Sequence, residues 1–324
     1  MLKLAGPAGR LGLCAAVGLG FALAGCAAEP VEEVAPAPPQ IVMEGERLFP
    51  ESITSDAAGN IYIGSNPGMI FKAAIGDETA PVWITPDEEN GLATVFGVLA
   101  DDARGLLWVC SNDMVGGGAP AIKTFSLADG SFVASYPLEV DGPAMCNDMT
   151  IAADGDVFAS EMAGGRIVKL ADGGDAFEVW ATDPEFASLD GISFGPGGEL
   201  YANAIQRNTL LHIAMDDDGT FAGTTVLETS QPMNGPDGLR PLDDTRMVQS
   251  EGNSGTITVL TFAEEGPVQV DVIADGIDYA SSVTVANGRA FYPEGKLSFL
   301  FDPNKQMQDP GDFIIRNAEI PGGE

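Results

Sequence analysis

The sequence predicts an all-β fold, a six-bladed β-propeller with four antiparallel strands in each blade. Three observations lead to this prediction. No long window of the chain shows helical periodicity, short runs rich in Val, Ile, Phe and Tyr are separated by Asp-Gly or Asn-Gly turns, and one sequence pattern recurs six times. We expect residues 41–324 to form the propeller.

Each repeat begins with the residue that starts a first strand, continues through a hairpin, and ends with a third and usually a fourth strand. Successive repeats are 43 to 51 residues apart. Their first residues are Glu51, Phe96, Asn147, Asp190, Asp237 and Ser281. Four strands in about 46 residues is the size of a propeller blade, whereas a β-sandwich would not produce six equal hairpins.

The two ends of the repeat array are expected to join and close the ring. The strand-like segment QIVMEGERLF, residues 40–49, precedes the first repeat and is expected to complete the last blade. Closure of this kind would remove exposed sheet edges. In the last blade we expect the third strand within GKLSFLFDPN, which starts at Gly295.

Residues 1–25 carry the pattern of a bacterial export signal. Lys3 and Arg10 form a positively charged segment before an apolar stretch, residues 11–24, that is too short to span a bilayer comfortably. The stretch ends in Leu-Ala-Gly-Cys, which resembles the lipobox in which the cysteine, here Cys26, is lipidated. An ordinary signal cleaved elsewhere is the alternative.

We therefore expect a cell-envelope lipoprotein. Its only membrane contact would be the lipid on Cys26, because an acyl anchor replaces a transmembrane helix. Residues 26–40 are rich in Pro, Ala and Glu and are expected to form an extended tether. Ala27 after the cysteine fits sorting to the periplasmic face of the outer membrane in a Gram-negative bacterium.

The charge balance excludes some classes of partner. The chain has 15 Lys and Arg against 48 Asp and Glu, a formal net charge of −33, so we expect no nucleic-acid partner. A single His excludes mechanisms that need two imidazoles. Cys110 and Cys146 remain after processing, and in an oxidising compartment either a disulfide or two buried thiols is open.

The first residues of the repeats are expected to converge on one point, because the first strand of each blade lines the propeller axis. Four of the six carry donor oxygens, and three of these are carboxylates that would repel one another without a cation. The four are Glu51, Asn147, Asp190 and Asp237. Ca²⁺ takes 6–8 such ligands, and the lack of His and Cys disfavours zinc or copper. Another divalent cation remains open.

Several motifs resemble those of the senescence-marker-protein/gluconolactonase family of six-bladed propellers. They are FPESI, NDMTIAADGDVF, DGISFGPGGELY and GPDGL, and the resemblance covers about residues 45–300. It implies that Glu51, Asn147, Asp190 and Asp237 ligate calcium and that Asp237 is also the catalytic base. Two positions depart from the family: Asp190 replaces an Asn, and Met145 replaces the Arg of the sugar lactonases.

The expected function is calcium-dependent hydrolysis of a small-molecule lactone or related ester. The alternative is a non-enzymatic binding or scaffold propeller with a structural calcium, because fold does not fix function. The second strands return to the same face, so we expect further pocket residues at their ends and beside the column. The candidates are Phe96, Met145, Glu161, Asn203, Glu251 and Ser281. His212 is expected to lie off the axis.

Overall fold

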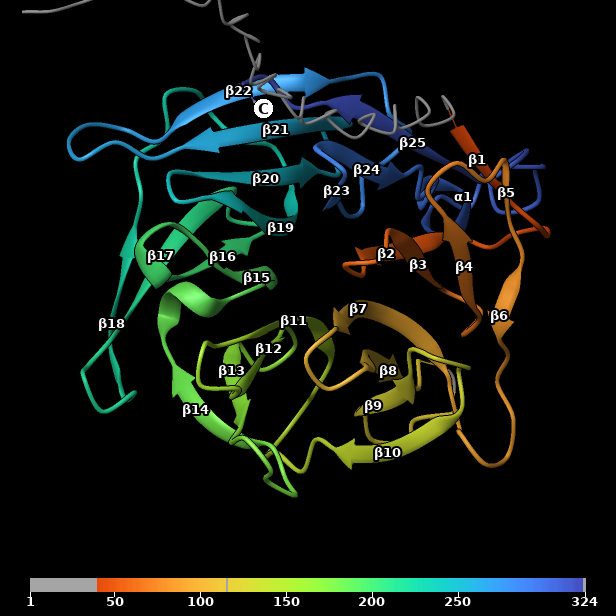
Figure 1. Cartoon of the computed structure of the whole chain (residues 1–324), viewed down its shortest axis with the longest axis horizontal. Coiled ribbons are helices and arrows are strands. Elements are labelled where there is room, and N and C mark those ends of the chain that lie inside the picture. The colour runs from red at the N-terminus through yellow and green to blue at the C-terminus, as the bar shows by residue number, and fades with distance from the viewer. Residues whose placement is uncertain (1–39, 115, 323–324) are drawn as a thin grey trace, which may run out of the picture. The chain divides into compact units, whose positions relative to one another are not determined.

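The computed structural model describes residues 40–114 and 116–322 of the 324-residue chain, so the expected signal peptide and the tether as far as residue 39, with Cys26, lie outside the described residues. Six blades of four antiparallel strands surround a common centre, which confirms the predicted six-bladed propeller (Figure 1). Within the described residues the longest helix, α1 (Ser298–Phe301), has four residues, and none could span a membrane.

Five blades follow the predicted order, with four strands each. Blade 1 contains β2 (Pro50–Ser55), β3 (Asn60–Ser65), β4 (Ile70–Ala74) and β6 (Val82–Ile84). Blade 2 contains β7 (Thr94–Asp101), β8 (Leu106–Asn112), β9 (Ala121–Ser126) and β10 (Phe132–Pro137). Blade 3 contains β11 (Cys146–Ile151), β12 (Val157–Glu161), β13 (Arg166–Leu170) and β14 (Glu178–Thr182).

The remaining blades repeat this arrangement. Blade 4 contains β15 (Leu189–Phe194), β16 (Leu200–Ala204), β17 (Thr209–Met215) and β18 (Phe221–Val226). Blade 5 contains β19 (Pro236–Asp243), β20 (Arg246–Glu251), β21 (Thr256–Thr261) and β22 (Gln269–Ala274). Blade 6 contains β23 (Thr284–Ala286), β24 (Arg289–Pro293), β25 (Ile314–Glu319) and β1 (Gln40–Met43). Two short 3₁₀ turns, η1 (Pro184–Phe186) and η2 (Pro196–Gly198), flank β15.

The ring closes through the N-terminal strand, as the sequence predicts. Strand β1 pairs antiparallel with β25, with Ile41 opposite Ile315. On its other edge β1 pairs in parallel with β5 (Thr79–Ala80), which comes from the connection between β4 and β6 of blade 1. The first and last parts of the propeller are therefore joined by backbone hydrogen bonds, and the outer edge of blade 6 is covered.

One predicted strand was wrong. The segment GKLSFLFDPN contains the helix α1, and the third strand of blade 6 is β25, which begins at Ile314. Lys296 adopts a left-handed φ of 51°, which breaks an extended run, and Leu297 is buried. Its neighbours Phe299 and Leu300 pack partly buried on the core between blades 6 and 1, so their apolar pattern serves a loop rather than a strand.

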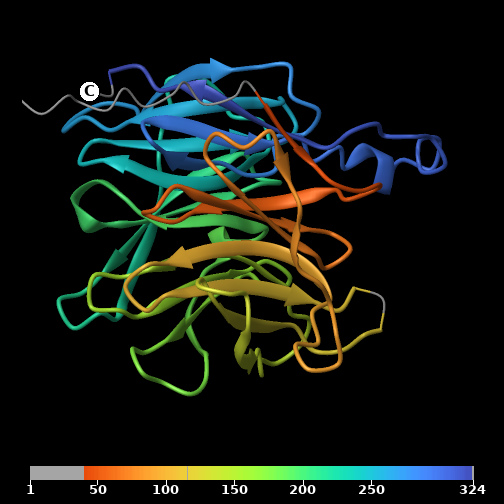
Figure 2. The same cartoon turned by 45° about the vertical axis from the view of Figure 1, so that its right-hand side comes forward.

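The corrected assignment leaves an insertion, residues 294–313, between β24 and β25. The corresponding connections in blades 1 and 3 to 5 have four residues each, Asn66–Met69 in blade 1 for example. Figure 2 shows the insertion, with α1, extending to one side of the sheets. It starts beside the axis, because a Cβ on Gly295 would lie 3.0 Å from Ser281 Oγ and 3.2 Å from the Pro50 carbonyl oxygen.

The described residues form six apolar clusters, and each joins two neighbouring blades. Between blades 2 and 3 the cluster includes a disulfide between Cys110 and Cys146, whose Cα atoms are 5.3 Å apart. The two cysteines could pair because Cys110 on β8 faces Cys146 at the start of β11. The sequence left a disulfide or two buried thiols open, and the structure has the disulfide.

Candidate functional site

The predicted axial residues lie in β-bulges. In each of the first five blades the register between the first two strands shifts at this point, for example between Leu189 and Ile192 in blade 4. The extra residues are Glu51, Phe96–Gly97, Asn147–Asp148, Asp190–Gly191 and Asp237–Gly238. A bulge leaves a residue outside the ladder and re-aims its side chain, which is how strand residues here can turn toward the axis.

Glycine follows the axial residue where neighbouring inner strands approach closely. A Cβ on Gly97 would lie 2.3 Å from the Asn147 carbonyl oxygen, and one on Gly191 would lie 2.3 Å from that of Asp237. No side chain fits at such a distance. The small residue that recurs in the sequence pattern is therefore a consequence of strand packing around the axis.

Five of the six column residues line one cavity: Glu51, Asn147, Asp190, Asp237 and Ser281. Ser52, Gly97, Asp148, Gly238 and Ser282 complete the lining. The volume open to the centre of a water-sized sphere is about 10 Å³, which is space for one ion or one water. The inner strands that supply these residues surround the centre in Figure 1.

The carboxyl groups of the cavity are electrostatically strained. Asp190 and Asp237 are each 4% exposed. Burial and the nearby Asp148 raise the pKa of Asp190 to about 7, although hydrogen bonds from Asp237 and Asn147 oppose the rise. Burial, followed by the charges of Asp190 and Glu51, raises the pKa of Asp237 well above its usual value. Such shifts mean that the ionised forms lack compensation from within the protein.

Glu51 takes part in the same electrostatic coupling. Burial, then the charges of Asp190 and Asp148, raise the pKa of the Glu51 carboxyl. A divalent cation would reverse these shifts, because opposite charge favours the ionised forms. The donor set is carboxylate and amide oxygen throughout, which suits Ca²⁺ or another hard cation. Across residues 40–114 and 116–322, however, no group of three or more His, Cys, Asp or Glu side chains is close enough together to hold a metal ion as the structure stands.

A buried ion pair that was not predicted from the sequence lies beside this cavity. Arg240 on β19 donates from Nη1 and Nη2 to the two carboxylate oxygens of Asp148, at 2.6 and 2.8 Å. Asp148 Oδ2 also accepts a hydrogen bond from the Ile192 backbone N–H at 3.1 Å. The guanidinium compensates Asp148, so the uncompensated carboxylates are those of Glu51, Asp190 and Asp237. The signal in the sequence was Asp148 itself, a charged residue at a position of the repeat that holds Gly or Ser in the other five repeats.

Side chains from neighbouring blades fix the backbone of the axial residues. Ser160 Oγ donates to the carbonyl oxygen of Asp190 at 2.6 Å, and Asn203 Nδ2 donates to that of Asp237 at 2.9 Å. Ser281 Oγ donates to the carbonyl oxygen of Pro50, the residue before Glu51, at 2.9 Å. Asn203, predicted as a pocket residue, therefore lies behind the cavity and positions Asp237.

Glu161 and Glu251, also predicted as pocket residues, hold loops and do not line the cavity. Glu161 is fully buried. Its carboxylate accepts hydrogen bonds from Arg166 Nε at 2.5 Å and from the Met145 N–H at 2.7 Å. Glu251 accepts from the Asn234 N–H at 2.7 Å. Both carboxylates thus anchor the segment that leads into an inner strand, because backbone donors there have no partner within the sheet.

The two predicted apolar pocket residues also lie outside the cavity lining. Phe96 turns from its bulge into the core between blades 2 and 3, and Gly97 reaches the cavity in its place. Met145 is partly buried in the segment before β11. A different methionine contacts the site: Met162 Sδ lies 3.8 Å from Asn147 Nδ2.

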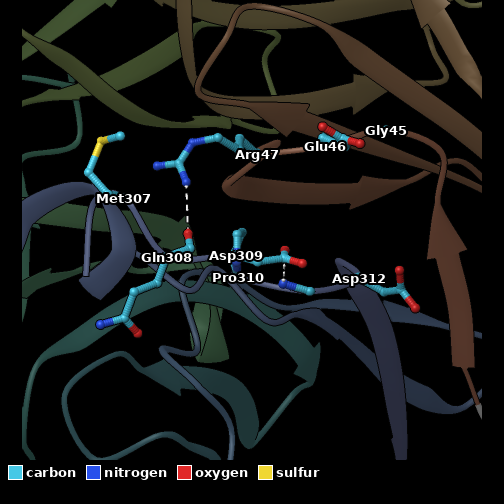
Figure 3. Close-up of a pocket in the computed structure, with 9 residues that line it drawn as sticks. Gly45, Glu46, Arg47, Met307, Gln308, Asp309, Pro310 and Asp312 are labelled. Carbon is cyan, nitrogen blue, oxygen red and sulfur yellow. Dashed lines mark hydrogen bonds between the residues drawn. The ribbon is translucent and has the colours of Figure 1, made fainter.

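Two other features are separate from the axial cavity. His212 lies on β17, away from the axis as predicted, with Nε2 3.0 Å from Glu199 Oε2. A larger hollow of about 400 Å³ lies between residues 45–47 and 307–312, where Arg47 Nη1 donates to the Gln308 carbonyl oxygen at 3.2 Å (Figure 3). This hollow contains none of the predicted site residues.

Solved structures share this fold at low sequence identity. A gluconolactonase from Xanthomonas campestris is 17% identical with a TM-score of 0.61, and the match covers 88% of this chain and 99% of that one. A calcium-binding protein, regucalcin, from Agrobacterium tumefaciens is 15% identical with a TM-score of 0.60, covering 88% and 95%. The resemblance to propellers of the gluconolactonase type is thus confirmed at the level of fold.

A lyase also has this fold. A catalytically inactive histidine-to-alanine variant of virginiamycin B lyase from Staphylococcus aureus, with quinupristin, is 14% identical with a TM-score of 0.56, covering 87% of this chain and 98% of that one. No family model matches the chain. No curated protein matches it in sequence.

Proposed function

We propose that this protein is a calcium-dependent hydrolase of a small-molecule lactone or related ester. One observation carries the proposal: oxygen-bearing side chains from four blades, Glu51, Asn147, Asp190 and Asp237, line one ion-sized cavity. Their carboxyl groups have raised pKa values because burial and mutual repulsion are uncompensated. The gluconolactonase and the calcium-binding protein of the same fold support this choice of chemistry.

The residues of the cavity divide into two roles. Glu51, Asn147 and Asp190 would hold the ion, and Asp237 would both hold it and activate water or attack the ester carbonyl. Bound calcium supplies Lewis acidity at the carbonyl oxygen. Asn203 keeps Asp237 in place through its backbone oxygen, and Arg240 pairs with Asp148, whose side chain lines the cavity.

The substrate we propose is less polar than a sugar lactone. Met145 stands where the sugar lactonases of the resembling family carry Arg, and Met162 contacts the Asn147 amide. Thioether side chains favour apolar or weakly polar groups over polyols. A lyase reaction that depends on a histidine is disfavoured, because His212, the only histidine of the sequence, lies on β17 and pairs with Glu199.

We also propose that the enzyme is held in the cell envelope by the lipid on Cys26, at the periplasmic face of the outer membrane. The support is the export signal and the Leu-Ala-Gly-Cys sequence. The strongly acidic chain has no charge reason to bind anionic lipid heads by itself.

A second candidate function is a binding or scaffold propeller in which the ion only ties the blades together. The small cavity volume of about 10 Å³ favours it, because this space accommodates an ion but no substrate group. The two functions share the metal site and differ in whether an ester reaches it.

A panel of lactones, aryl esters and phosphotriesters, assayed with and without calcium, separates the two functions. We expect turnover of at least one lactone or ester with calcium and its loss after chelation by EGTA. The calcium-free assay of the same preparation is the control. Protein that binds calcium and hydrolyses nothing in the panel would establish the scaffold function instead.

Calcium should raise the melting temperature whichever function holds. A ligand at 100 times its Kd stabilises the folded state by about 2.7 kcal/mol. For a propeller of roughly 280 residues, with an unfolding entropy of about 2.1 cal/mol/K per residue, that corresponds to about 4–5 °C. Differential scanning calorimetry with calcium and with EGTA measures the shift, and magnesium serves as the control cation. Identical melting temperatures under both conditions would argue against any calcium site.

A further inference from the structure

The first residue of β11, Cys146, is held by the neighbouring blade at both its backbone and its side chain. It directly precedes Asn147 and forms the disulfide with Cys110 of β8. Its N–H donates to Asn112 Oδ1 at 3.0 Å, and its carbonyl oxygen accepts from Asn112 Nδ2 at 2.8 Å. The carboxamide of Asn112 therefore satisfies both backbone polar groups of Cys146, as a neighbouring strand would.

Asn112 reaches Cys146 because the inner hairpin of blade 2 is longer at its axial end. Strand β7 begins two residues before Phe96, the first residue of its repeat, whereas β11 begins one residue before Asn147. The additional pair in blade 2 is Thr94 opposite Asn112, which is buried. Alternate residues of a strand face the same side, so Cys110 and Asn112 both face blade 3.

Asn147 needs support of this kind because it lies in a β-bulge. The register between β11 and β12 shifts after Cys146, so Asn147 lies outside the regular ladder between the two strands. On the C-terminal side of Asn147, the Asp148 N–H donates to Ser160 Oγ at 3.0 Å. On the N-terminal side, Asn112 fixes Cys146. The position of Asn147 therefore depends on both of these anchors.

Among the four proposed ligands, Asn147 is the one whose placement depends most on the protein. The other three, Glu51, Asp190 and Asp237, are carboxylates that a cation attracts through their charge, whereas the carboxamide of Asn147 carries no net charge. Ligands of a metal are oriented by the groups behind them, and loss of such a group typically weakens metal binding 10–100-fold. A group that fixes the backbone next to Asn147 can therefore affect the ion directly.

We propose that Asn112 is a positioning residue of the metal site, which fixes Cys146 and thereby holds the side chain of Asn147 in the ion cavity. The role rests on the proposed function only through its metal site, which the scaffold function shares. It gives blade 2 a part in the site, although the Phe96 side chain turns away from the cavity. The disulfide with Cys110 holds the same residue from its side chain.

Asn112→Ala tests the role, because it removes both hydrogen bonds to Cys146 and keeps the disulfide. We expect the Kd for calcium, measured by titration calorimetry, to rise about tenfold. Asn90→Ala is the matched control. Asn90 is also buried, and its carboxamide binds the Thr85 carbonyl oxygen and the Leu92 N–H, each at 2.9 Å, between β6 and β7. The control should lower the melting temperature and leave the Kd at the wild-type value.

A double-variant comparison separates positioning of Asn147 from a general loss of structure. Asn147→Ala removes the amide ligand and leaves the carboxylates of Glu51, Asp190 and Asp237, so calcium should still bind, but more weakly. Adding Asn112→Ala to this variant should change the Kd by less than about twofold, because no ligand side chain remains for it to position. A general loss of structure would instead weaken binding by the same factor in both backgrounds.

The outcomes distinguish this role from the function on which it rests. Wild-type affinity in Asn112→Ala, or an equal loss with and without Asn147, would overturn the role of Asn112 and leave the hydrolase function standing. Wild-type protein that binds no calcium would overturn the metal site itself. A loss of affinity confined to protein that retains Asn147 supports the role. Asn112→Ser, whose shorter side chain cannot bind both groups of Cys146, takes the place of the alanine variant if that variant does not fold.

Discussion

Asp237→Asn is expected to lower kcat/KM by about 10²–10⁴-fold, the usual contribution of a positioned general base, while the protein still folds. The amide keeps the shape of the side chain and one acceptor oxygen, but it cannot take a proton from water. It also removes one of three crowded carboxylates, so calcium affinity should fall as well. Steady-state kinetics at saturating calcium separates the loss of chemistry from the loss of metal.

The same substitution should stabilise the calcium-free protein. The raised pKa of Asp237 shows that its ionised form is disfavoured by burial and by the charges of Asp190 and Glu51. Asp244→Asn, an exposed site in the β19–β20 turn of the same blade, is the matched control and should change neither property. An Asp237→Asn variant with wild-type turnover at saturating calcium would remove Asp237 from the chemistry.

Arg240→Met is expected to destabilise the protein by about 3–5 kcal/mol, the typical cost of leaving a buried charge without its partner. Asp148 is 4% exposed and would then stand uncompensated beside three further carboxylates. Urea unfolding at neutral pH, with EGTA present, measures the change in the free energy of unfolding. The large effect follows from removing one partner only.

The double variant Asp148→Asn/Arg240→Met supplies the control. Asparagine carries no charge and keeps an acceptor oxygen for the Ile192 N–H, so most of the lost stability should return. An Arg240→Met variant within about 0.5 kcal/mol of wild type, the usual range for a surface substitution, would mean that Asp148 finds compensation elsewhere.

The repeat pattern was sufficient to predict the blades because each blade is a local unit. A hairpin of short β-branched and aromatic runs specifies its strands from within about 15 residues, and six such units close only as a ring. Closure by residues 40–43 could be predicted because a ring needs an outer partner for β25. The strand placed in GKLSFLFDPN was wrong because Phe299 and Leu300 are apolar for a packing reason that the pattern does not distinguish from a strand.

The site was predictable to the extent that it follows the repeat. Glu51, Asn147, Asp190 and Asp237 share one position in the repeat, and the structure brings all four to one cavity. The pocket residues predicted at the ends of second strands, such as Glu161 and Glu251, do not line this cavity. Glu161 and Glu251 serve backbone N–H groups of loops, which depend on how a loop folds and cannot be inferred from spacing.

By itself, the sequence determined the number of blades, the order of strands and the set of axial oxygens, because these depend on local periodicity repeated along the chain. Only the tertiary structure decided the bulges that turn Asp190 and Asp237 inward, the disulfide of Cys110 and Cys146, and the pairing of Arg240 with Asp148. Each of these joins groups from different blades or sets the register between strands, and such contacts exist only once the ring has closed.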